Sequence, residues 1–253
     1  MLANRLKAVL PQIILENQSA FLSERLITDN VLVAFELMHY LDHKKEGNES
    51  FIAIKLDMSK AYDRVEWMFV EKVMRRLGLN DKYIGWIMKC ISIVSYFVLI
   101  NGEAHGSIVP SRRFRQGDLL SSYLFLLYTK VFSALIADAS SKHVLNGISI
   151  CKECPKVTHL FFADDSLLFC GAKSQECHKL VKILQKYEAA SRQKISTNNS
   201  SIFFSHNIAH EARTNILEIP GPTSTSVSHL SLENPRIKCL QKLKKRWARN
   251  WPD

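Results

Sequence analysis

The sequence predicts an α+β fold, in which helices pack on an antiparallel sheet. Three observations lead to this class. Apolar residues recur at helical spacing in some segments, other segments are short apolar runs bounded by turn residues, and one Asn-Gly dipeptide separates two extended runs, as in a tight hairpin. Along the 253 residues, these segments give the order ααβαββαββα.

Residues 1–48 are predicted to be helical and to be followed by a strand. The segment TDNVLVAFELMHYL begins with Thr28, a candidate N-cap. One apolar stripe then consists of Val31, Phe35 and Met38. The run FIAIKLDM is short and almost entirely apolar, which predicts a strand that is buried on both faces and ends at Asp57.

The most regular helical pattern is DRVEWMFVEKVMRRLG. Asp63 and Glu66 stand at capping-box spacing, which favours a helix cap over a catalytic role for Asp63. Gly78 is a typical helix stop. The apolar stripe of this predicted helix consists of Val65, Phe69, Val73 and Leu77.

The second half of the pattern begins with a hairpin. Asn101-Gly102 lies between the two extended runs of SYFVLINGEAHGSIV. A long apolar helix is then predicted to begin between Leu119 and Ser122. Two short strands in VTHLFFADDSLLFC and a helix in CHKLVKILQKYEAASRQ complete the order.

Composition narrows the class of partner. The formal charge of +10 and the pI of about 9.3 favour polyanions, nucleic acid first, although many basic proteins bind none. The six cysteines are scattered, which is typical of reduced thiols. Cys151 and Cys154 form a C-x₂-C pair, but no second ligand pair stands at zinc spacing, so ordinary thiols are favoured over a metal site.

The sequence also predicts an intracellular protein, nuclear or cytoplasmic. The start MLANRLKAVL lacks the apolar stretch of a secretory signal. The longest apolar runs are interrupted by polar residues, so no membrane span is expected.

Three carboxylates are the candidate reactive groups. Asp164 and Asp165 interrupt the apolar run HLFFADDSLLFC, where they fit a hairpin turn between Leu160–Ala163 and Ser166–Phe169. The simpler interpretation is that Asp-Asp is only a good turn dipeptide. Asp57, at the end of a buried strand, favours a functional role instead, because a buried carboxylate needs a positive charge to compensate it. A sheet that brings the three together would offer oxygen ligands for two Mg²⁺ ions.

Four segments together resemble a known family. AIKLDMSKAYDRVEW, RQGDLLSSYLFLLY, FFADDSLLF and SRQKISTNNSSIFFS are similar, in order and spacing, to motifs A to D of reverse transcriptases, and most closely to those of plant-like LINE-type (non-LTR) retrotransposons. The upstream segment ANRLKAVLPQIILENQSAF resembles the region between fingers and palm in these enzymes.

The resemblance implies the right-hand polymerase architecture, with a palm and partial fingers. We expect 1–48 to be the partial fingers and fingers-palm region, and 49–210 to be the palm. Residues 211–235 read as a poorly ordered linker rich in Pro, Ser and Thr, and 236–253 as a basic tail. Parts of the fingers and a complete thumb are expected to be missing, which makes this a truncated domain.

The same resemblance implies roles for individual residues. The metal-binding carboxylates of the family correspond to Asp57, Asp164 and Asp165, with two Mg²⁺ ions, or Mn²⁺, as cofactor. The aromatic gate beneath the incoming sugar corresponds to Tyr62. The motif B loop around the template base and the incoming nucleotide corresponds to Arg115, Gln116 and Gly117. The implied reaction is RNA-directed DNA synthesis, in which a primer 3′-hydroxyl attacks the α-phosphate of a dNTP. RNA template, DNA primer and dNTPs are the implied partners.

Several positions depart from the family pattern. Leu119 and Ser122 stand where the family has prolines, and Arg113 and Arg192 stand where it has glycines. Asn199 replaces a lysine that could act as a general acid. These departures and the expected truncation leave an alternative open, namely a catalytically silent retroelement-derived fragment that at most binds nucleic acid.

Overall fold

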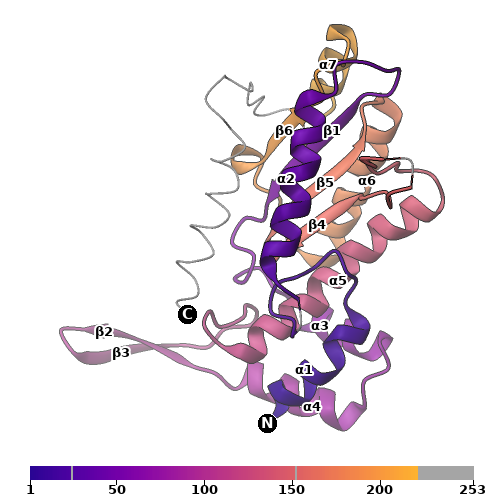
Figure 1. Cartoon of the computed structure of the whole chain (residues 1–253). Coiled ribbons are helices and arrows are strands. Elements are labelled where there is room, and N and C mark those ends of the chain that lie inside the picture. The colour runs from indigo at the N-terminus through magenta and orange to yellow at the C-terminus, as the bar shows by residue number, and fades with distance from the viewer. Residues whose placement is uncertain (24, 152, 222–253) are drawn as a thin grey trace.

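A four-stranded antiparallel sheet organises the protein, in the strand order β4-β5-β1-β6 (Figure 1). Its strands are β1 (Phe51–Asp57), β4 (His159–Phe162), β5 (Asp165–Gly171) and β6 (Ser201–Phe204). The computed structural model describes residues 1–23, 25–151 and 153–221. Within these residues the predicted α+β class and antiparallel sheet are confirmed.

Helices cover both faces of the sheet (Figure 1). On one face, α2 (Ile27–His43) packs Ala34, Leu37 and Leu41 against inward-facing residues such as Phe169. On the other face lie α5 (Leu119–Ser141) and α6 (Ser174–Ser191). Because successive strand residues point to opposite faces, a strand covered on both sides is apolar on both faces, as β1 is except at Lys55 and Asp57.

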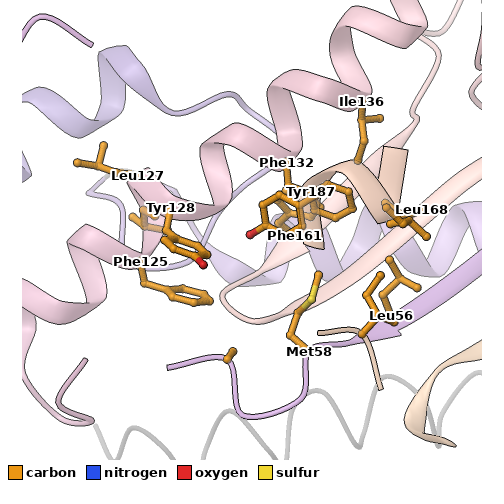
Figure 2. Packing of buried hydrophobic residues seen from close by; sticks show 14 of the residues in the cluster. Leu56, Met58, Phe125, Leu127, Tyr128, Phe132, Ile136, Phe161, Leu168 and Tyr187 are labelled. Atoms are coloured by element: carbon orange, nitrogen blue, oxygen red, sulfur yellow. The ribbon is translucent and has the colours of Figure 1, made fainter. Parts of the chain in front are cut away.

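Aromatic rings fill the larger core, between the sheet and α5 (Figure 2). Phe132 of α5 stacks on Phe161 of β4, with ring centroids 5.4 Å apart, and on Tyr187 of α6, at 4.7 Å. The hydroxyl of Tyr128 donates a hydrogen bond to the carbonyl of Ser191 at the end of α6. These contacts fix α5 and α6 against the strands that carry the aspartates.

Smaller elements surround this central layer. The remaining helices are α1 (Leu2–Ile13), α3 (Trp67–Arg76), α4 (Asp81–Ser92), the 3₁₀ helix η1 (Thr197–Asn199) and α7 (His210–Leu217). The hairpin of β2 (Tyr96–Ile100) and β3 (Glu103–Ile108) projects away from the rest of the molecule (Figure 1). Asn101 and Gly102 form its turn, as predicted, and both have a positive φ.

Two predicted helix starts are wrong. The helix α2 begins at Ile27, so Thr28 lies inside it, and the Asp29 carboxylate accepts the backbone N–H of Leu26 instead. The helix α3 begins only at Trp67, so Asp63 lies in the preceding turn and caps no helix. The predicted stop at Gly78 is confirmed by its φ of +80°.

The predicted order of elements omits four that the structure contains. These are α4, η1, β6 and α7. The last begins at His210, so the structure differs from the predicted linker over its first residues, where Ile216 and Ile219 are buried in the core. The rest of the predicted linker and the basic tail 236–253 lie outside the described residues.

The central helix α5 is long and apolar enough to cross a membrane by length and composition. The expectation that no apolar segment reaches this length is therefore wrong. However, 61% of the most apolar window of α5 is buried inside the protein, which is typical of the core helix of a globular fold.

Candidate active site

Two of the predicted aspartates lie directly opposite each other across neighbouring strands. Asp57 is the last residue of β1 and pairs in register with Asp165, the first residue of β5. Asp57 is only 7% exposed and Asp165 only 5%. Carboxylates at opposed positions of a sheet repel each other when both are ionised, and a bound cation relieves this repulsion. The pair therefore indicates a site that a cation would stabilise.

The turn before Asp165 differs from the predicted one. Asp165 is not in the turn but in the strand, where it pairs with Phe162. The two turn residues are Ala163, with a φ of +58°, and Asp164, which is half-buried. A positive φ at the first residue of a two-residue turn is typical of a type II′ hairpin. Asp164 and Asp165 thus differ in environment, although they are adjacent in sequence.

The segment around η1 holds the end of β1. The side-chain amide of Asn199 donates to Oδ2 of Asp57, with 3.2 Å between Nδ2 and Oδ2. The backbone N–H of Ser196 donates to the carbonyl of Asp57, at 2.8 Å. The backbone N–H of Asp57 donates to Oγ of Ser200, at 3.3 Å. Ser196 and Ser200 are positioning contacts that sequence reasoning missed, since serines in a polar segment carry no local signal of them.

Tyr62 lies in the turn between β1 and α3, stacked on Phe125 of α5 with ring centroids 4.6 Å apart. Burial raises the pKa of the Tyr62 hydroxyl to about 12; a hydrogen bond with Ser122 opposes this rise and the negative charge of Asp164 adds to it. The hydroxyl is therefore protonated at neutral pH, and the side chain offers an aromatic surface and a hydroxyl group rather than a base.

The loop that contains Arg115, Gln116 and Gly117 leads into α5 and is exposed. These three residues line a cavity of about 410 Å³ together with Trp67 and Tyr96. Among the residues that the structure describes, Tyr62 and the three aspartates are not part of the lining of this cavity. The predicted loop residues thus surround a cavity that the carboxylates do not line.

Backbone hydrogen bonds tie this loop to the turn that holds Tyr62. The N–H of Phe114 donates to the carbonyl of Tyr62, and the N–H of Arg113 donates to that of Val65, both at 2.9 Å. Phe114 is buried and anchors the loop in the core. The helix α5 then begins at Leu119, because the Asp118 carboxylate accepts the N–H groups of the next turn.

Carboxylate oxygens are the donors that Mg²⁺ takes in proteins, so Asp57 and Asp165 fit such an ion chemically. In residues 1–23, 25–151 and 153–221, no three His, Cys, Asp or Glu side chains are grouped closely enough to hold a metal ion. Of the three predicted ligands, the structure therefore brings Asp57 and Asp165 opposite each other.

The cysteine prediction needs a correction. Cys151 and Cys154 are joined by a disulfide and are not reduced thiols. Their Cα atoms lie 5.2 Å apart, within the range that a disulfide spans. Cys90, Cys170 and Cys177 are free.

Sequence comparison identifies the family to which this fold belongs. The family described as "Reverse transcriptase (RNA-dependent DNA polymerase)" matches residues 1–234. The chain belongs to the reverse transcriptase family. Reverse transcriptases normally use divalent metal ions, which agrees with the chemistry of the carboxylate pair.

Relatives connect this reverse transcriptase domain to mobile elements. It is 27% identical over 202 residues to the "Transposon TX1 uncharacterized 149 kDa protein" of Xenopus laevis, which covers 78% of this chain and 14% of that protein. It is 29% identical over 132 residues to a retrovirus-related Pol polyprotein from the type-1 retrotransposable element R2 of Popillia japonica, which covers 52% of this chain and 21% of that protein. The predicted resemblance to non-LTR retrotransposons is confirmed.

A plant relative matches over a shorter segment. An uncharacterized mitochondrial protein of Arabidopsis thaliana is 47% identical over 68 residues, which covers 27% of this chain and 56% of that protein. The chain therefore spans less than two thirds of the length of each of these three relatives.

Solved structures agree on the fold. The telomerase of Candida albicans superposes with a TM-score of 0.54 and 16% identity, over 80% of this chain and 34% of that chain. The telomerase of Candida tropicalis gives a TM-score of 0.52, over 80% of this chain and 39% of that chain. At this identity the likeness shows the fold alone. It confirms the predicted α+β fold of the polymerase palm type.

Proposed function

We propose that this reverse transcriptase domain catalyses RNA-directed DNA synthesis, transferring a nucleotidyl group from a dNTP to a primer 3′-hydroxyl. The observation that carries the proposal is the in-register pairing of buried Asp57 with Asp165. Each proposed substrate, the RNA template, the DNA primer and the dNTP, is a polyanion, which suits a chain with a net charge of +10.

The proposed cofactor is Mg²⁺, two ions, with Mn²⁺ as a substitute. Asp57, Asp164 and Asp165 would hold them. When bound, such ions activate the attacking hydroxyl and neutralise charge on the phosphates. Asp164 belongs to the proposed set because it directly precedes Asp165 and its charge reaches Tyr62.

The other predicted residues take binding roles in this proposal. Tyr62 would lie under the sugar of the incoming nucleotide, where its ring, held flat against Phe125, would exclude a 2′-hydroxyl by its bulk. Arg115, Gln116 and Gly117 would contact the template base and the incoming nucleotide from the neighbouring loop. Because the backbone of Phe114 is hydrogen-bonded to that of Tyr62, the loop and the ring would move as one unit.

A second candidate function is a catalytically silent domain that only binds nucleic acid. It is favoured by the lack of a complete metal-ligand group in the part of the chain that the structure describes. It is also favoured by Asn199, because the neutral amide beside Asp57 cannot supply a proton to the leaving pyrophosphate.

Primer extension on an RNA template with Mg²⁺ separates these candidates. We expect Asp165→Asn to lower the extension rate by on the order of 10²-fold or more, since the change keeps the shape and removes the charge. Asp63→Asn is the matched control, because Asp63 is exposed and lies outside the paired site, and it should extend like the unmodified chain. Equal incorporation by all three proteins would contradict the proposal. Template binding without extension by the unmodified chain would favour the silent domain.

A further inference from the structure

The segment around Gln18 lies along the free edge of β4. The backbone N–H of Phe161 donates to the carbonyl of Asn17, at 2.8 Å, and Gln18 forms a parallel bridge with Phe161. The side chain of Asn17 donates to the carbonyl of His159, at 2.9 Å. The side-chain amide of Asn30 donates to the carbonyls of both Asn17 and Phe161. The segment is therefore fixed to the strand that leads into the Asp164 turn.

The side chain of Gln18 reaches that turn. Its Oε1 accepts the backbone N–H of Ala20, at 3.0 Å, and that of Ala163, at 3.4 Å. Gln18 is only 3% exposed, so water competes little for these bonds. Ala163 has a φ of +58°, a conformation that is unfavourable for alanine and that needs support from its surroundings.

The orientation of the Gln18 amide follows from these two donors. If the amide were flipped, Nε2 would face two N–H groups and both hydrogen bonds would be lost. In the observed orientation, Nε2 is buried and has no hydrogen-bond partner in the described part of the chain. Leaving a buried donor unpaired is costly, so the fold accepts this cost in order to hold the turn.

We propose that Gln18 is a positioning residue for the Asp164–Asp165 pair, acting through the backbone of Ala163. This inference rests on the proposed function, in that the pair is taken to be the reactive site, but Gln18 itself contacts no substrate. Ala163 stands between Phe162, which pairs with Asp165, and Asp164. Its backbone angles therefore set the direction of the Asp164 carboxylate relative to Asp165.

The test compares Gln18→Leu, which removes the acceptor, with Gln18→Glu, which keeps it. The first readout is amide hydrogen exchange at Asp165, which needs neither metal nor substrate. The second is Mn²⁺ affinity, measured by electron paramagnetic resonance. We expect Gln18→Leu to speed the exchange and to weaken Mn²⁺ binding by roughly tenfold, and Gln18→Glu to do neither.

A rescue variant distinguishes positioning from general stability. Adding Ala163→Gly to Gln18→Leu should restore slow exchange and Mn²⁺ affinity, because glycine adopts a positive φ without support. Ser19→Ala is the matched control, since Ser19 is an adjacent buried residue whose hydroxyl has no partner among the described residues, and both readouts should stay unchanged. Unchanged exchange in Gln18→Leu, or no rescue by Ala163→Gly, would overturn the inference. Failure of the proposed function would give a different result. The unmodified chain would not extend a primer, but Ala163→Gly would still restore slow hydrogen exchange in Gln18→Leu.

Discussion

Two arginines occupy backbone conformations that favour glycine. Arg113 has a φ of +91° and Arg192 a φ of +60°, and both stand where the family pattern has glycine. Arg113 has compensating contacts, because its guanidinium lies 4.9 Å from the ring centroid of Tyr96 and its carbonyl accepts the indole N–H of Trp67. Arg192 is exposed and ends α6 as a left-handed C-cap. Both departures from the family pattern therefore place a side chain where the backbone favours glycine.

Replacing Arg192 by glycine should stabilise the protein. A non-glycine residue in the left-handed region costs on the order of 1 kcal/mol, and glycine removes this cost. We expect Arg192→Gly to raise the free energy of unfolding by about 1 kcal/mol, measured by urea denaturation. The matched control is Ile93→Gly, at the exposed C-cap of α4, where φ is −84° and glycine should destabilise. A loss of stability in Arg192→Gly would show that its side chain makes a contact worth more than the strain.

At the scale of elements, the hairpin of β2 and β3 has the predicted turn, but its apolar side chains are not covered by another helix or sheet in the described part of the chain. Apolar side chains on it are half to three-quarters exposed, among them Phe97, Leu99 and Ile108. An isolated two-stranded hairpin is marginally stable in water. The central strand β1, in contrast, is covered on both faces and paired on both edges.

Hydrogen exchange should therefore separate the two sheets. We expect the backbone amides of β2 and β3 to exchange orders of magnitude faster than those of β1, because local opening of the hairpin breaks few buried contacts. The measurement is exchange detected by mass spectrometry, with β1 as the internal reference. If the hairpin is protected like β1, some surface covers it in solution, and repeating the experiment at several protein concentrations tests whether that surface is a second copy.

How far the sequence predicted these elements depends on whether their signals are local. Asn101-Gly102 requires a positive φ at both positions, so the hairpin turn could be read directly. The stripe of α2 could be read only in part, because Val31 and Met38 pack against the core but are only partly buried, whereas Leu37, which the sequence did not single out, is fully buried. Such a choice is made by tertiary packing, and a helical pattern alone leaves it open.

The candidate site shows the same limit. Asp57, Asp164 and Asp165 were identified by resemblance and by their unusual place in apolar runs. The pairing of Asp57 with Asp165 joins residues more than a hundred positions apart, so no local pattern specifies it. Asp165 was expected in the turn because Asp is a good turn residue, yet Ala163 takes that place, supported by Gln18 from a distant segment. Long-range hydrogen bonds of this kind leave no trace in local propensity.

At the scale of the whole molecule, one buried histidine links the sheet to the central helix. His159 begins β4 and is 2% exposed. Its Nε2 lies 2.7 Å from Oγ of Ser133 in α5, and its Nδ1 lies 3.0 Å from Oγ1 of Thr158. Burial, with a smaller effect of the positive charge of Lys130, lowers the pKa of His159 from 6.5 to about 4. The ring is thus neutral in the folded protein at neutral pH and can be exposed only by separating α5 from the sheet.

This makes global stability depend on pH. Below its ordinary pKa of 6.5, His159 takes up a proton in the unfolded chain, whereas the folded protein resists protonation until about pH 4. The stability present above pH 6.5 is therefore lost as the pH falls through this window, by about 3 kcal/mol at most.

Urea denaturation between pH 7.5 and 4.5 should show a smaller loss of stability in His159→Gln than in the unmodified protein, because the variant has no proton to take up at this position. His178→Gln, at an exposed position on α6, should keep the original pH dependence, and an identical pH slope in all three proteins would contradict the assignment to His159.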